Sequence, residues 1–406
     1  MISKKNIFIW SLYDFGNSFV FITFTLYFSK WLVVDRGLSD LWYNATFILG
    51  SIGLLIFGPW LGSRADQYNR ERRYLALSTV GCFIFYVFAI IGAVLNFNVY
   101  FSALFFGLGN FFYQLSFVFY TPLLDNISTS ENKGRVSGIG FLGNYLGQIA
   151  GIVTALPLIS GQISLGVPFL IAPLIPSTIF FILLSMPLML KKEIYEKPNH
   201  SPNPAMGQVA LMRSVFVIPG VLFFMLSYFL FSDAILTMTN NFSIYTSNIF
   251  IVNDTDLSIL TLFIIISAGL GALLWGFASD KMGSKRALLY NLAAWIIIIP
   301  AVAWIMNYSL FFVFGILAGV FIGGTFAVSR QLLIELVPKN MLNYIFGIYT
   351  VFERAATILG PAVWVVILGI GGYRWAMFSM VFFQVFAFWF LYKIKIKKPQ
   401  LAKSAI

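Results

Sequence analysis

Gly276–Arg286 reads G-F-A-S-D-K-M-G-S-K-R and lies between two long apolar runs. A short, strongly basic segment in that position is typical of a connector between two membrane-spanning helices. We expect its two glycines, Gly276 and Gly283, to let the helices and the turn pack closely. Asp280 can lie at a helix start, where its charge meets unpaired N–H groups. The segment ends on two basic residues, Lys285 and Arg286.

A looser copy of this segment occurs earlier, at residues 62–73, and reads G-S-R-A-D-Q-Y-N-R-E-R-R. Gly62 and Asp66 precede Gly276 and Asp280 by the same 214 positions. Two further glycine pairs, Gly138 with Gly347 and Gly151 with Gly360, share an offset of 209. Constant offsets predict two parallel halves of about 200 residues, as in transporters built from internal repeats. The basic residues of the earlier copy include Arg70, Arg72 and Arg73.

The two copies, called the signature segments below, resemble the loop that the major facilitator superfamily carries between helices 2 and 3 and again between helices 8 and 9. The resemblance extends to W-S-L-Y-D-F-G-N-S at residues 10–18, G-G-T-F-A-V-S-R at 323–330 and R-A-A-T-I-L-G-P at 354–361. These stretches are similar to the vacuole-effluxer (autophagy-related) branch, which has many bacterial members. That resemblance implies an all-α membrane fold and efflux of amino acids. Gln67 and Asn69 depart from the pattern, where a basic residue and a glycine are usual.

Composition agrees with a membrane protein. Of 406 residues, 59% are hydrophobic and 10% charged, against about 25% charged in soluble domains. Residues 191–213 are polar and rich in proline, and we interpret them as a cytoplasmic linker between six-helix bundles at 1–190 and 214–406. The longest outer connection is expected at 241–256. Apolar runs predict twelve spans, near 7–34, 43–62, 74–96, 99–124, 136–158, 164–190, 214–240, 257–278, 287–306, 309–336, 344–369 and 373–393.

The formal net charge of +11 does not indicate a nucleic-acid partner, because the basic residues gather on one side of the predicted membrane. Of 26 lysines and arginines, 21 fall in segments on the side of the N-terminus and 3 on the other. This asymmetry places both termini in the cytoplasm, and we expect a protein of the bacterial inner membrane. Lys4 and Lys5 precede a run too long for a signal peptide, which predicts a retained first helix.

Several classes of chemistry are excluded by what the sequence lacks. Cys82 is its only cysteine and His200 its only histidine, so it forms no disulfide within the chain, no cysteine or histidine metal site and no histidine relay. It has no G-x-x-x-x-G-K-[ST] motif for a nucleotide. We therefore expect no cofactor and no enzyme. The expected partners are the lipid bilayer and a small-molecule substrate with a coupled proton, and we expect a monomer.

Ionisable residues inside the predicted spans are the candidate functional groups, because each needs a partner or a water-filled cavity. Asp14 is the candidate proton carrier, unless hydrogen bonds to Asn17 or Tyr13 hold it. Arg330 and Glu353 are predicted at similar depth, either as a buried pair or as a substrate anchor with its counter-ion. The remaining two are Asp233, expected towards the outer mouth, and Arg354, about 100° round the helix from Glu353 and assigned to the gate between the halves.

Neutral polar residues recur on single helix faces and predict the walls of a cavity. These are Asn110, Tyr113 and Gln114 on one helix and Asn144 and Gln148 on the next. Gate residues are predicted at the signature segments. Asp66 and Asp280 are switch residues there, and Asp125 and Glu335 should pair with basic residues of their own half's segment.

The sequence thus predicts a secondary transporter that moves a small polar solute by alternating access, with export of amino acids implied by the resemblance. A multidrug or siderophore-type exporter on the same fold is an alternative, which mostly apolar cavity walls would favour. A membrane receptor or lipid-handling protein without transport is another. The intact Asp66 and Asp280 argue against that last alternative.

Overall fold

The computed structural model describes residues 4–68, 70–128, 133–195, 220–337, 345, 349, 352–353 and 356–394, with the side chains of residues 63, 133–135 and 137 and of Asp66 and Asp125 outside that description. Its regular elements in these ranges are all helical. They are α1 Lys4–Thr23 with π-helical turns Phe24–Phe28 and Trp31–Asp35, α2 Asp40–Gln67, α3 Glu71–Val94, α4 Val99–Tyr120, α5 Leu123–Asn126, α6 Lys133–Ile159, α7 Leu174–Leu190, a 3-10 turn Lys192–Ile194, α9 Val221–Ile249, α10 Asp254–Met282, α11 Ser284–Trp304, α12 Tyr308–Leu336 and α14 Leu359–Lys393.

Helices dominate because a bilayer offers no water to satisfy exposed backbone groups. Among the described residues, ten helices are long and apolar enough to cross a membrane, and α7 is a shorter apolar helix. α14 is not continuous, since Gly372 has φ 78° and ψ −177° and separates 359–371 from 373–393. The last two predicted spans therefore adjoin at Gly372. The protein is an all-α integral membrane protein.

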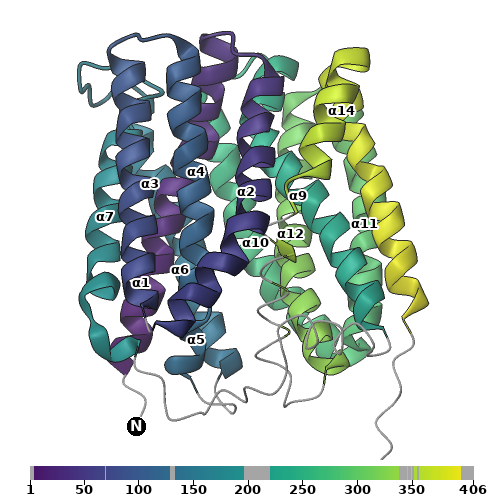
Figure 1. Ribbon diagram of the computed structural model, residues 1–406. Helices are drawn as coiled ribbons and strands as arrows, with labels where there is room; N and C mark the ends of the chain where they lie inside the picture. The colour runs from purple at the N-terminus through teal and green to yellow at the C-terminus, as the bar shows by residue number, and fades with distance from the viewer. Residues whose placement is uncertain are drawn as a thin grey trace, which may run out of the picture.

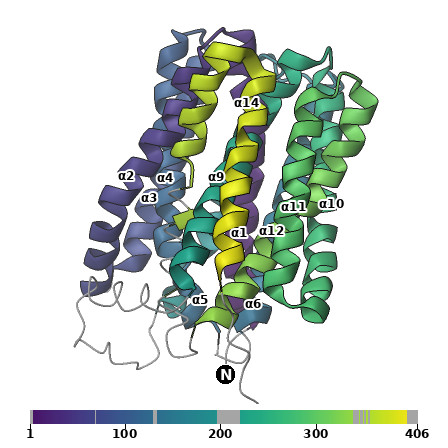
Figure 2. The same cartoon turned by 90° about the vertical axis from the view of Figure 1, so that its right-hand side faces the viewer.

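The buried apolar side chains form two clusters. One gathers residues between Ile9 and Ile194, together with a few from α9 and α10, and the other residues between Val221 and Ile394. Figure 1 shows the corresponding helices side by side, the first set in purple to teal on the left and the second in green to yellow on the right. In Figure 2 α14 and α9 lie next to each other at the front.

One contact between two helices occurs at equivalent positions in both halves of the chain, and its residues are related by the two offsets found in the sequence. A Cβ on Gly151 of α6 would lie 2.9 Å from the carbonyl oxygen of Phe19 in α1. A Cβ on Gly360 of α14 would lie 2.9 Å from the carbonyl oxygen of Asp233 in α9. Gly360 follows Gly151 by 209 positions, and Asp233 follows Phe19 by 214. The same close approach of two helices thus occurs once in each cluster.

The glycines of the later signature segment act differently from one another. Gly283 has φ 88° and ends α10 in a conformation that favours glycine. A Cβ on Gly276 would meet nothing within 4 Å, so the predicted close packing at Gly276 is wrong. The tight approach lies deeper, where Gly319 and Gly323 of α12 face α10 and a Cβ on either would overlap a carbonyl oxygen of α10.

The predicted long outer connection at 241–256 is also wrong. α9 continues to Ile249, and only residues 250–253 separate it from α10. The polar residues that suggested a loop face the first cluster instead. Ser243 donates to the carbonyl oxygen of Leu26, and Asn241 exchanges hydrogen bonds with Asn44. Polar side chains at a helix interface satisfy one another, so polarity alone did not mark the end of the helix.

Candidate substrate cavity

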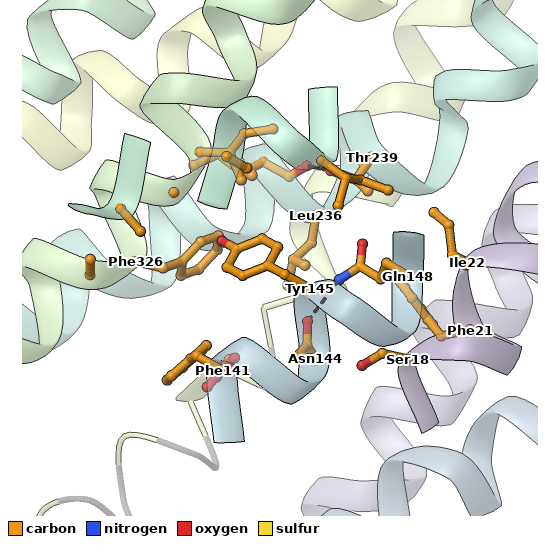
Figure 3. A pocket seen from close by; sticks show the side chains of 18 of the residues that line it. Ser18, Phe21, Ile22, Phe141, Asn144, Tyr145, Gln148, Leu236, Thr239 and Phe326 are labelled. Carbon is orange, nitrogen blue, oxygen red and sulfur yellow. Dashed lines mark hydrogen bonds between the residues drawn. The ribbon is translucent and has the colours of Figure 1, made fainter. Parts of the chain in front are cut away.

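A cavity of about 1940 Å³ lies between the two sets of helices. α1, α2, α4 and α6 line it from one side, and α9, α10, α11 and α12 from the other. Figure 3 shows part of its wall, with Asn144, Tyr145 and Gln148 of α6 opposite Leu236 and Thr239 of α9. Most of the lining side chains are apolar, and the polar groups among them are few.

Six of the predicted pathway residues line this cavity: Asp14, Tyr113, Asn144, Gln148, Arg330 and Glu353. Three of them form a chain. Gln148 donates through Nε2 to Asn144 Oδ1 at 2.7 Å, the dashed bond of Figure 3, and Asn144 donates through Nδ2 to Asp14 Oδ1 at 3.4 Å. One partner of Asp14 is therefore the side-chain amide of Asn144 in α6, a different helix from the one that carries Asp14.

Arg330 reaches across the cavity to the other set of helices. Its guanidinium carbon lies 3.6 Å from the ring centre of Phe141 in α6 and 5.8 Å from that of Tyr349. Its Nε is buried without a hydrogen-bond partner. Arg330 and Glu353 are both described and both line the cavity, but they form no ion pair with each other in this structure. A cation over an aromatic face, with no ion pair to any carboxylate in the described part of the chain, leaves a positive charge in the cavity.

Four predicted pathway residues are buried in helix interfaces and do not line the cavity: Asn17, Asn110, Gln114 and Asp233. Of the three residues predicted on α4, only Tyr113 lines the cavity. Gln114 faces α2, where its Nε2 would lie 3.4 Å from a Cβ on Gly50. Asn110, Tyr113 and Gln114 share one face of α4, and that face borders both α2 and the cavity. Arg354 lies outside the described residues.

Asp233 occupies the middle of α9, and its predicted position near the outer mouth is wrong because α9 ends at Ile249. Its side chain is fully buried. Oδ2 accepts a hydrogen bond of 2.8 Å from the backbone N–H of Gly360, and α14 begins at Leu359. The carboxylate thus lies at a helix start, where unpaired N–H groups favour negative charge. The segment before it, residues 356–358, is bent.

The two sets of helices are joined at the end opposite the signature segments. At that end, hydrogen bonds link Tyr27 with Ser258, Tyr43 with the carbonyl oxygen of Asn240, Asn44 with Asn241, Ser243 with the carbonyl oxygen of Leu26, and Tyr373 with Asp40, and an ion pair links Lys30 with Asp254. A further hydrogen bond, between Ser51 and Thr357, lies nearer the middle of the helices. None of these bonds lies at the signature end. The cavity is therefore sealed on one side.

The signature segment of the second set is held within its own half. Gln331 donates through Nε2 to Asp280 Oδ1 at 3.0 Å and also contacts Ser279. Ser284 Oγ donates to Glu335 at 2.5 Å, so the predicted pairing of Glu335 with a basic residue is wrong. The basic residue Lys285 instead donates to two carbonyl oxygens at the end of α14.

The basic residues of the first signature segment bind no carboxylate among the side chains that are described. Arg72 donates to the carbonyl oxygen of Leu190, and Arg70 lies over the ring of Tyr68. The pairing predicted for Asp125 and the switch predicted for Asp66 concern side chains outside the description. Of the linker, residues 196–213 are likewise outside it.

Sequence reasoning missed Phe141 and Gln331. Phe141 was one of 45 phenylalanines and carried no distinguishing feature by itself. Its position gave a usable signal, since it precedes Asn144 by three residues and Gln148 by seven and so shares their helix face. Gln331 follows Arg330 directly and links the cavity wall to Asp280.

The comparisons with known proteins agree with this geometry. A family model described as Major Facilitator Superfamily matches residues 217–405. An uncharacterized MFS-type transporter of Bacillus subtilis, YxiO, is 24% identical over 380 residues, covering 87% of this chain and 86% of YxiO. Autophagy-related protein 22 of Candida glabrata is 24% identical over 173 residues, covering 39% of this chain and 30% of that protein.

Two solved transporters show the same fold. A bacterial homologue of the human lysosomal transporter Spinster, inward-facing and unoccupied, superposes with a TM-score of 0.73 at 14% identity, covering 96% of this chain and 97% of that one. The nucleoside transporter NupG gives a TM-score of 0.69 at 15% identity, covering 96% of this chain and all of that one.

Proposed function

Because this chain belongs to the major facilitator superfamily of transporters and is a transport protein, not an enzyme, we propose that it exports a small anionic or zwitterionic solute by alternating access. We propose that the chain crosses the membrane twelve times, in two six-helix halves, 1–190 and 214–406, joined by the linker 191–213. The two apolar clusters and the division of α14 at Gly372 support this arrangement.

The cavity is proposed to face the cytoplasm in this structure. The excess of basic residues on the N-terminal side supports a cytoplasmic signature end. Most of the inter-half hydrogen bonds described above lie at the other end. Transport then requires these bonds to break while new contacts form at the signature end, with Asp66 and Asp280 as the switch residues.

The observation that carries the proposed substrate charge is the guanidinium of Arg330, which lies in the cavity and forms no ion pair with a described carboxylate. A planar guanidinium fits a carboxylate with two parallel hydrogen bonds, and such bonds are stronger where water is scarce. The stacking on Phe141 fixes the plane of the guanidinium. Glu353, which also lines the cavity, is suited to the ammonium group of a zwitterion.

Metabolite profiling of cells with and without the protein, followed by flux in proteoliposomes, would identify the solute. On purified protein, Arg330→Lys should then lose most of the solute affinity while the protein stays folded, because lysine keeps the charge and loses the planar fork. A brace between helices would behave differently. The double variant Arg330→Gln with Glu353→Gln would in that case transport normally, and the anchor role would be refuted.

Asp14 is proposed to carry the coupled proton, supported by its place at the end of the Gln148–Asn144 chain in the cavity. Asp14→Asn should keep exchange of the solute across the membrane and lose its accumulation against a pH gradient. Loss of both activities together at normal protein yield would assign Asp14 to solute binding instead.

A multidrug exporter is the second candidate, and one observation favours it: most of the cavity wall is apolar. Such a transporter would accept cations and neutral compounds as well as anions. Flux that Arg330→Lys leaves unchanged, for several unrelated compounds, would support it over the anion exporter.

A further inference from the structure

One wall of the cavity is a continuous apolar surface built from two helices. Leu142, Leu146 and Ile149 recur along α6, and Ile266, Leu270 and Leu273 recur along α10. Their spacing of three or four residues places each set on one helix face. At a rise of 1.5 Å per residue each stripe is about 10 Å long. We call these six residues the apolar wall.

The two stripes do not cover each other. Leu142 is 58% exposed and Leu270 56% exposed, although both belong to helices that meet across the halves. That meeting lies further towards the sealed end, where Leu257 and Ile265 of α10 join the first apolar cluster together with Ile152 of α6. The apolar wall therefore begins where the packing of α6 against α10 ends, and it faces the cavity.

The charged anchor adjoins this wall. Phe141, on which Arg330 stacks, directly precedes Leu142 in α6. The polar chain from Gln148 through Asn144 to Asp14 starts from the same helix. One cavity thus offers a cation at one place and about 10 Å of uncovered aliphatic surface beside it.

We infer that the transported solute is an amphiphile, with an anionic head that binds Arg330 and an aliphatic chain that lies along the apolar wall. The inference rests on the proposed function and names its substrate class. A solute with only a small side chain would leave the wall in contact with water. An aliphatic chain removes that surface from water, and each buried CH₂ should tighten binding about fourfold.

Binding of butanoate, octanoate and dodecanoate to purified protein in nanodiscs tests this, with empty nanodiscs measured alongside to subtract partition into lipid. Affinity should rise about fourfold per CH₂ until the chain fills the wall. Leu270→Gln should weaken dodecanoate at least tenfold and leave butanoate unchanged. Leu274→Gln is the matched control, since Leu274 is equally exposed on α10 and does not line the cavity. Leu142→Gln repeats the test from α6 if Leu270→Gln is unstable.

The outcomes separate this inference from the proposed function. If the three carboxylates bind equally and Arg330→Lys weakens all of them, the anchor stands and the amphiphile is refuted. If a chain-length dependence persists unchanged in Leu270→Gln and Leu142→Gln, the chain lies elsewhere and the inference is refuted too. If no carboxylate binds, the anion site fails together with the inference.

Discussion

Asn241→Ala should open the sealed end of the cavity, because the side chain belongs to a reciprocal pair between the halves. Asn44 donates to Asn241 at 3.1 Å and Asn241 donates to Asn44 at 2.9 Å, and both side chains are fully buried. Alanine leaves one carbonyl and one N–H of Asn44 without partners in the sealed state. The space left by the amide can hold one water, which satisfies one of these two groups. The other stays unpaired, and this destabilises the sealed state by about 1–3 kcal/mol. In the unsealed state both groups meet water.

That difference shifts the equilibrium between the two states by about 5- to 150-fold. The assay is labelling of Thr25→Cys by a membrane-impermeant thiol reagent added from the sealed side, in a variant without the native cysteine. Thr25 lines the cavity next to Leu26, whose carbonyl oxygen belongs to the seal. Its labelling rate should rise by the same factor in Asn241→Ala.

Asn248→Ala is the matched control. Asn248 lies on the same helix and bonds only to the carbonyl oxygen of Ile244, one turn away. Its replacement should leave the labelling rate as in the parent. An unchanged rate in Asn241→Ala, at normal protein yield, would show that the amide pair does not contribute to the seal.

Three further predictions concern topology, the switch and packing. Cysteines at Ile251 and Met282, both exposed, should label from opposite sides of the membrane in a background without the native cysteine, and labelling from one side would contradict the proposed topology. Asp280→Asn should keep normal yield and change cysteine accessibility on both sides, because Asp280 bonds Gln331 in this state; unchanged accessibility and flux would remove its assignment as a switch. Gly319→Val should lower the thermal stability sharply, since a Cβ there overlaps α10, whereas Gly276→Ala, with open space around it, should not; equal melting temperatures would contradict the packing argument.

The repeat was readable from the sequence because glycine and aspartate recur at fixed offsets. Gly151 and Gly360 show why: each lies where another helix passes within contact of its backbone, so any side chain would collide. Only glycine fits at such a position, so the constraint is visible in the sequence as a glycine. The close approach at Gly319 and Gly323 corresponds to an equally clear spacing of four residues in the sequence.

The ends of helices and the directions of side chains were harder to predict from the sequence. The polar residues near Asn241 led to the prediction of a loop. They belong instead to a helix whose polar face contacts polar side chains of α2, and the sequence alone does not reveal that contact. Asn110, Tyr113 and Gln114 share a face, yet only Tyr113 reaches the cavity. Glu335 bonds a serine in place of a cation because carbonyl groups at the end of α14, distant in sequence, bind Lys285. Each of these outcomes depends on partners that helical periodicity does not identify.

The hydrogen bond between Asp233 and Gly360 also bears on how the protein is made. Its two partners are 127 residues apart, and synthesis proceeds from Asp233 towards Gly360. α9 must therefore enter the bilayer with a carboxyl group at its middle, at a cost of about 2.5–3.5 kcal/mol on insertion scales, before the N–H group that binds it has been translated. Its neighbours in α9 are strongly apolar and offset this cost. Until the start of α14 has been synthesised, the carboxylate of Asp233 lacks the backbone N–H of Gly360, and the packing of the second half is completed only when α14 is in place.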